Sequence, residues 1–148
     1  MSETPSELNV RPFADAMAPM PRTWRPIELT APFSPSPGQL MTDGTVIFSD
    51  SDTNNWWKLT PDEFGGYEHG TWSKTGPSPN YGPTYFASAT LPDGRLIVEG
   101  GEYLAGNQNP VRTTRGAIYD PVADLWTAMT PPSIFTQTIG DASSIVLD

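Results

Sequence analysis

The stretch "LPDGRLIVEGG", residues 91–101, carries the signals that decide the fold. An Asp-Gly pair at Asp93 and Gly94, flanked by β-forming residues, is a strong signal for a hairpin turn. The run that follows is short and rich in branched apolar residues, as strands are, and it ends at Gly100 and Gly101. A glycine pair lets the backbone leave a strand at φ values closed to other residues and lie close to a neighbouring sheet. Because no helix pattern follows, a structural pair is favoured over a phosphate-binding loop.

Similar stretches recur along the chain. "LMTDGTVIF" at 40–48 resembles "TLPDGRLIV" at 90–98, and "GTWSKTGPSP" from Gly70 resembles "DLWTAMTPP" from Asp124. A third copy begins in "ASSIVLD", where Leu147 matches Leu91 of "FASATLPD". A period of about 50 residues with four strand-like runs per unit is typical of kelch-type propeller blades. No segment sustains helical apolar spacing over three turns, so the sequence predicts an all-β protein.

The residues within each unit strengthen this interpretation. "LIVEGG", "GAIYDP" and "LWTAM" resemble the kelch repeat, in which a glycine pair, a tyrosine and a tryptophan follow in this order. The chain resembles the kelch branch related to the central domain of galactose oxidase, over roughly residues 38–148. In the first unit "IFSDSD" replaces the glycine pair, and we place Trp57 in the tyrosine position. The resemblance implies a fragment of a kelch-type β-propeller with four-stranded antiparallel blades.

The repeat assigns strands to blades, lettered A to D from the propeller axis outward. In blade one we expect strand A near 38–42 and strands B, C and D at 45–49, 56–59 and 71–74; in blade two the four strands fall at 85–91, 95–99, 116–120 and 125–129. The blades then span 38–76 and 82–131, and 139–148 begins a third. Residues 1–37 form a proline-rich arm, with a candidate isolated outer strand near Trp24. Such a piece would need further blades or other chains to complete a ring.

Composition excludes several functions. The chain of 148 residues has a formal net charge of -9, which disfavours nucleic acid and anionic membranes as partners. It has no cysteine and a single histidine, His69, so thiolate and multi-histidine metal sites are excluded. The N-terminus lacks the pattern of a secretory signal and no apolar run reaches membrane-span length, so the compartment is open, with the cytoplasm as the default. We expect no cofactor.

Binding residues are expected on one rim of the propeller. In an up-and-down blade the B–C and D–A loops lie on the same face, and rigidly held loops commonly carry binding residues. The long B–C loop of blade two, "GGEYLAGNQNPVRTTR", is the favoured segment, although a merely solvated loop is the alternative. Glu99, at the end of a strand, is either a ligand contact or a residue paired with Arg112 or Arg115. The candidate ligand-binding residues are Glu99, Glu102, Tyr103, Asn107, Gln108, Arg112 and Arg115.

Other polar and aromatic motifs favour structural roles. "DSDTNN" from Asp50 alternates oxygen side chains as calcium loops do, but Asn55 and Pro61 stand where an EF-hand needs glycine and glutamate, so a polar turn is favoured. Trp72 and Trp126 are expected between blades rather than as sugar-stacking platforms. No nucleophile-elbow, paired-carboxylate or phosphate-loop motif occurs. The sequence favours a non-catalytic module that binds protein or carbohydrate; the alternative is a fragment of a galactose-oxidase-like enzyme with its catalytic residues elsewhere.

Overall fold

The computed structural model consists of strands joined by turns and loops. It describes residues 24–51, 53–76, 78, 81–105, 109, 111–134 and 136–147, and within these ranges there is no helix. The predicted all-β class is confirmed. The strands are β1 (Pro35–Leu40), β2 (Val46–Asp50), β3 (Trp56–Thr60), β4 (Thr71–Lys74), β5 (Pro83–Thr84), β6 (Ala87–Thr90), β7 (Leu96–Glu99), β8 (Tyr103–Leu104), β9 (Gly116–Asp120) and β10 (Leu125–Met129).

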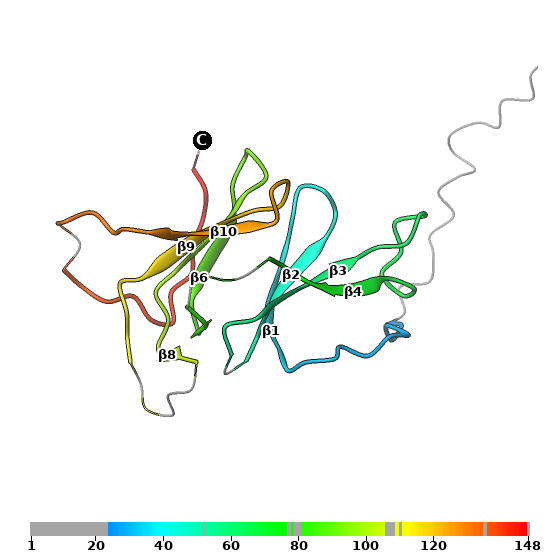
Figure 1. The fold of residues 1–148 in the computed structure, drawn as a ribbon, viewed down its shortest axis with the longest axis horizontal. Helices are drawn as coiled ribbons and strands as arrows, with labels where there is room; N and C mark the ends of the chain where they lie inside the picture. Colours follow the sequence, from blue (N-terminus) through cyan, green and yellow to red (C-terminus); the bar gives the residue numbers. More distant parts are fainter. Residues whose placement is uncertain are drawn as a thin grey trace, which may run out of the picture.

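These strands form two four-stranded antiparallel sheets and one small two-stranded sheet (Figure 1). The first sheet has the order β1-β2-β3-β4, and the second has the order β10-β9-β7-β6. Each large sheet is therefore a simple meander, as the repeat predicted. The small sheet, formed by β5 and β8, was not predicted. Residues 83–84, which directly precede the predicted strand at 85–91, pair with β8 instead of continuing into β6. Tyr85, with φ of 57°, turns the chain between them, and β6 therefore begins later than the predicted strand at 85–91.

Both predicted Asp-Gly turns are present and have the same hydrogen bonds. Gly44 takes a φ of 84° and Gly94 a φ of 88°, a conformation that glycine adopts without steric cost. The Asp93 carboxylate accepts the backbone N–H of Arg95 at 3.1 Å, and Asp43 accepts that of Thr45 at 2.9 Å. The side chain of each aspartate thus fixes the turn that aligns the first two strands of its sheet.

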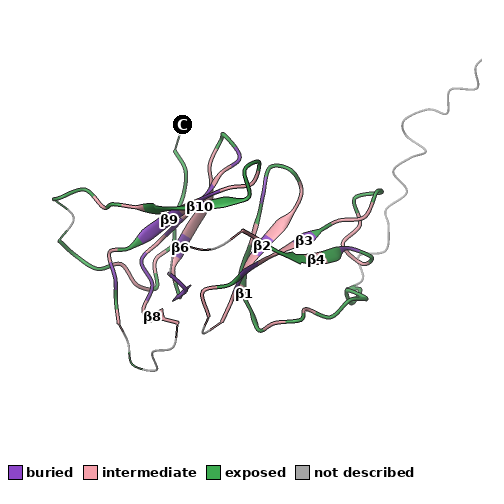
Figure 2. Cartoon of the chain, in the orientation of Figure 1, coloured by how far each residue is buried: buried purple, intermediate pink, exposed green. Residues whose placement is uncertain are grey.

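The two sheets pack against each other through opposite faces. In β2 the buried side chains are Ile47 and Ser49, whereas in β7 they are Leu96 and Val98. The repeat spacing of 50 residues aligns Ile47 with Ile97, but the buried residues beside Ile97 are Leu96 and Val98. The set of buried positions is therefore shifted by one residue between the two sheets. Because side chains alternate along a strand, this shift means that unlike faces meet. Purple buried segments accordingly gather where the sheets approach each other (Figure 2).

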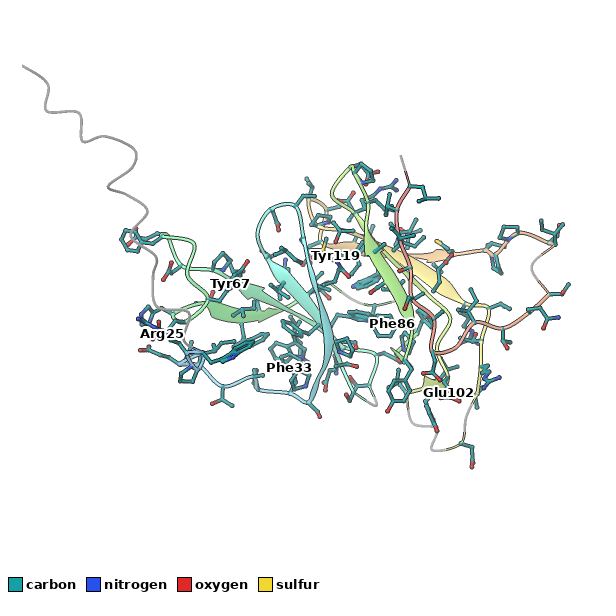
Figure 3. The ribbon with its side chains drawn as sticks, turned by 180° about the vertical axis from the view of Figure 1, so that it is seen from behind. Arg25, Phe33, Tyr67, Phe86, Glu102 and Tyr119 are labelled. Carbon is teal, nitrogen blue, oxygen red and sulfur yellow. The ribbon has the colours of Figure 1, made fainter. Side chains whose placement is uncertain are left out.

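The shared core is built around aromatic rings. Trp126 on β10 is 5 % exposed, and its ring lies 4.6 Å from Trp56 of the first sheet and 5.1 Å from Tyr119 of the second. Its indole N–H donates to Thr75 Oγ1 at 3.2 Å, which links the outer strand to the end of the other sheet. Phe86 packs edge-on against Trp56 (Figure 3). The predicted place of this tryptophan between repeats is correct.

A polar contact crosses the same junction. Lys58 Nζ lies 3.5 Å from Asp124 Oδ1, and the Tyr119 hydroxyl donates to that oxygen at 2.6 Å. Desolvation favours protonation of Asp124, but the bonds from Tyr119 and the Gly76 N–H, together with Lys58, outweigh it and lower its pKa. Burial, and then the bond to Asp124, raise the pKa of Tyr119. The carboxylate therefore stays ionised and ties β3 to β10.

Residues 25–34, here called the strap, cover the outer face of the first sheet. The Phe33 ring stacks on Trp57 with centroids 5.0 Å apart and stands edge-on to Trp72 at 5.2 Å (Figure 3). The Trp72 indole N–H donates to Leu29 O at 2.7 Å, much as Trp126 does to Thr75. An ion pair between Arg25 and Glu68, 3.1 Å long, holds the start of the strap. The strap thus supplies the aromatic cover that the second sheet receives from the first.

The pairing register corrects one prediction. Trp126 lies opposite Tyr119 across β9 and β10, and Trp72 lies opposite Leu59 across β3 and β4. The residue in the tyrosine position of the first repeat is therefore Leu59, and the assignment of Trp57 was wrong. The sequence alignment placed the tyrosine position two residues too early, whereas strand pairing fixes it.

The two ends of the described chain run as irregular segments. Trp24, near the candidate outer strand, is fully exposed, and residues 24–34 form no strand. At the other end Ile139 forms an isolated bridge with Thr113, and the Ser144 hydroxyl donates to Ser88 O at the edge of β6. The C-terminal segment thus runs beside β6, where the repeat places the first strand of a third unit (Figure 1).

Candidate functional site

Three loops meet at one end of the two sheets. The small sheet β5–β8 joins the loop before β6 to the loop after β7, with Glu102 N–H donating to Thr84 O at 3.0 Å and Ala105 N–H to Gly82 O at 2.8 Å. The loop between β2 and β3 reaches the same place, since a Cβ on Gly82 would lie 2.7 Å from Asn54 Oδ1. Long loops from both repeats therefore share one rim.

The glycine pair at the end of β7 supports this rim. Gly100 has φ of 72° and Gly101 φ of 123°, so both need the freedom that glycine has. A Cβ on Gly100 would lie 2.6 Å from the Ile139 side chain, and one on Gly101 would lie 2.8 Å from Pro83. Gly101 N–H donates to Ile139 O at 2.8 Å. The pair is structural, as predicted, and it brings the chain after β10 against the loops.

The predicted site residues do not form one cluster. Glu102 and Arg112 form an ion pair of 3.6 Å on the rim, in which the glutamate is the more buried partner. The Tyr103 ring lies edge-on to Tyr85, with centroids 5.9 Å apart. Glu99 is half-buried, and no arginine of the described residues lies within 4.0 Å of its carboxylate. Asn107 and Gln108 lie outside the described residues.

A cavity of about 180 Å³ lies where the three loops meet, and Arg115 is the predicted residue that lines it. Its other lining residues come from the loops of both repeats. They are Asn54, Tyr81, Gly82, Leu104 and Ala105.

Tyr81 forms a buried wall of this cavity. It is 4 % exposed, and its hydroxyl donates to Gly100 O. Burial, and to a lesser extent the charge of Glu99, raise the pKa of Tyr81 well above its ordinary value, whereas Arg115 opposes this. The phenol therefore remains neutral at physiological pH, and its ring and hydroxyl brace the glycine pair.

Sequence reasoning identified Arg115 but missed the rest of the cavity lining. Tyr81 and Gly82 lie in "PNYGPT", which reads as a turn because of its Pro, Asn and Gly residues. The signal that was available is the glycine directly after an aromatic residue, which indicates close approach of another backbone. Asn54 belongs to the segment considered for calcium; there Thr53 N–H donates to Asp50 O at 3.1 Å and closes a turn.

The described ranges lack both a metal-binding cluster and a membrane-spanning helix. They contain no group of three or more histidine, aspartate or glutamate side chains placed to hold a metal ion. They also contain no helix long and apolar enough to cross a membrane.

Comparison with known proteins identifies the fold. No protein-family model and no curated protein matches the chain. The solved structure of YjhT aligns with a TM-score of 0.57 and 21% identity over 79% of this chain and 32% of that chain. A fungal alcohol oxidase of the AA5 family, in complex with copper, aligns with a TM-score of 0.48 and 29% identity over 64% of this chain and 18% of that one.

The chain thus spans about a third or less of either structure. The likeness to YjhT, together with the two meander sheets, places the chain in the class of kelch-type β-propeller folds.

Proposed function

We propose that this chain is a non-catalytic, propeller-type module that binds a protein or a glycan through the rim of its β2–β3, β4–β6 and β7–β9 loops. The single observation that carries the proposal is the cavity at the junction of these loops. Concave sites with a few polar groups at the junction of structural units are where ligands commonly bind. The cavity is small, so it accepts one group of a larger ligand and the surrounding rim contacts the remainder.

The rim also offers the mixture of side chains that polar ligands need. The Glu102–Arg112 pair presents a charged acceptor and a charged donor on the same loop as the aromatic ring of Tyr103. Aromatic and arginine side chains are enriched where protein surfaces bind partners. The β5–β8 pairing holds this loop against the scaffold, which reduces the entropy lost on binding.

A matched pair of arginine variants tests the proposal. Arg112 lies on the rim in an ion pair with Glu102, whereas Arg95 lies at the opposite end of the sheet, in a pair with Asp93 of 2.7 Å. Glycan and peptide arrays would be probed with the chain and with Arg112→Gln, Tyr103→Ala and Arg95→Gln variants. We expect a ligand whose binding weakens by about tenfold in the two rim variants and is unchanged in Arg95→Gln.

Two outcomes count against the proposal. Equal loss in the Arg95→Gln variant would place the contact surface elsewhere on the molecule. Chemical conversion of a bound glycan would instead favour the alternative, a fragment of a carbohydrate-active enzyme.

A further inference from the structure

Arg115 is distinguished from the other cationic side chains of the described chain. Arg25, Lys58, Arg95 and Arg112 each lie within 4.0 Å of a carboxylate, and Lys74 lies over the ring of Trp57 at 5.3 Å. No carboxylate of the described residues lies within that distance of the Arg115 guanidinium. In a chain with a formal net charge of -9, acidic partners are abundant. Arg115 is exposed, so its guanidinium is solvated and open to an anionic ligand.

The base of the Arg115 side chain is held in place. Its backbone N–H donates to Thr113 Oγ1 at 3.0 Å, and its carbonyl accepts the Gly100 N–H at 2.8 Å. Strand β9 begins at the next residue, so the Cα is fixed by the sheet. A guanidinium on a rigid base loses less entropy when it binds than one on a mobile loop.

The surroundings of Arg115 leave its charge available. On the same loop, Arg112 and Glu102 neutralise each other. Glu99 is the nearest acid along β7 and remains beyond ion-pair distance. Leu104 and Ala105 give the cavity an apolar wall, beside the ring of the buried Tyr81.

We propose that this cavity binds a carboxylate group of a small ligand, or of a larger ligand's side branch, with the Arg115 guanidinium as its principal partner. This inference deepens the proposed function, on which it rests. The planar fork of arginine matches a carboxylate and gives paired, charge-assisted hydrogen bonds. The volume of about 180 Å³ corresponds to roughly six water molecules, enough for a carboxylate and a short apolar stem.

Benzoate is a suitable probe, because it joins a carboxylate to a flat apolar ring. The isotopically labelled chain would be titrated with benzoate, with the neutral isostere benzamide and with inorganic phosphate, while backbone amide signals are followed by NMR. We expect saturable shifts at Gly82, Ala105 and Arg115 with benzoate, and binding at least about tenfold weaker with benzamide. Tighter binding of phosphate than of benzoate would overturn the assignment to carboxylates.

Substitutions of Arg115 test whether its charge binds the carboxylate. Arg115→Gln is expected to weaken benzoate binding by about tenfold or more, whereas Arg115→Lys, which keeps the charge without the fork, should give an intermediate loss. Arg95→Gln, at the far end of the sheet, should bind as the parent chain does. Amide spectra report whether each variant keeps its fold. Unchanged affinity in Arg115→Gln would refute the inference.

The results separate this inference from the proposed function. If binding of an array ligand depends on Arg112 but not on Arg115, and benzoate does not bind, the proposed binding rim is supported and the proposed carboxylate site is refuted. If benzoate binds at Arg115 but no ligand is found on the arrays, the carboxylate site is supported and the proposed binding rim is not.

Discussion

Trp126→Ala is expected to destabilise the chain strongly. The side chain is 5 % exposed, contacts aromatic rings of both sheets, and donates its indole N–H to Thr75. Truncating a buried aromatic residue costs ~3–5 kcal/mol in unfolding free energy, because it removes buried area and leaves a cavity. For a chain of this size that corresponds to a fall in Tm on the order of 10 °C.

The repeat provides a matched comparison in Trp72. It occupies the corresponding position on β4, but the strap rather than a sheet covers it, and it is half-buried. Trp72→Ala should therefore cost about half as much, ~1.5–2.5 kcal/mol. Urea unfolding followed by circular dichroism measures the unfolding free energy of both variants, and similar m-values make the two free energies comparable. Equal losses, or an unmoved midpoint for Trp126→Ala, would refute the inference that the sheets pack through these opposite faces.

Three further expectations concern the strap and the glycine pair. Phe33→Ala should lower the unfolding free energy by about 1–2 kcal/mol and increase binding of an apolar dye, since it uncovers the outer aromatic face; unchanged dye binding would count against the strap as a cover. The Glu28 carboxylate lies 3.1 Å from His69 Nδ1 and raises the pKa of that imidazole through a hydrogen bond and charge attraction. The contact therefore stabilises the fold below the ordinary pKa of histidine, and this stabilisation is lost as pH rises through the raised pKa. An NMR titration of His69 should show a higher midpoint in the parent chain than in the Glu28→Gln variant, and equal midpoints would contradict the contact. Gly100→Ala should cost on the order of 1–3 kcal/mol, because its φ of 72° strains any other residue, and a neutral result would mean that the loop relaxes.

Sequence patterns that depend on neighbouring residues predicted the fold well. The Asp-Gly turns at Asp43 and Asp93 fixed the first hairpin of each sheet, because turn geometry needs only four or five consecutive residues. Strands β9 and β10 fall at the predicted ranges, since each is a short β-rich run bounded by turn residues.

Features that depend on contacts between distant segments could not be predicted in the same way. The β5–β8 pairing involves four residues with no pattern of their own, and it is set by how two loops meet. The stack of Phe33 on Trp57 joins a proline-rich arm to a strand, and nothing in the arm's composition indicates it. Within the cavity, Arg115 was identifiable as a charged loop residue, whereas Tyr81, which is buried, was marked in the sequence only by the glycine that follows it.

The shift of one residue between the buried sets of β2 and β7 has a consequence for symmetry. The interface between the sheets is heterologous, because one sheet contributes the face that begins with Ile47 and the other contributes the face that begins with Leu96. A stack of sheets built on this interface has a direction, because each sheet contributes a different face to each of its two neighbours. A two-fold axis between sheets cannot reproduce the contact, since it would bring like faces together. Repetition of the contact by rotation about one axis produces a ring where the rotation closes, and the direction of the stack follows from which side of β2 is buried against the second sheet.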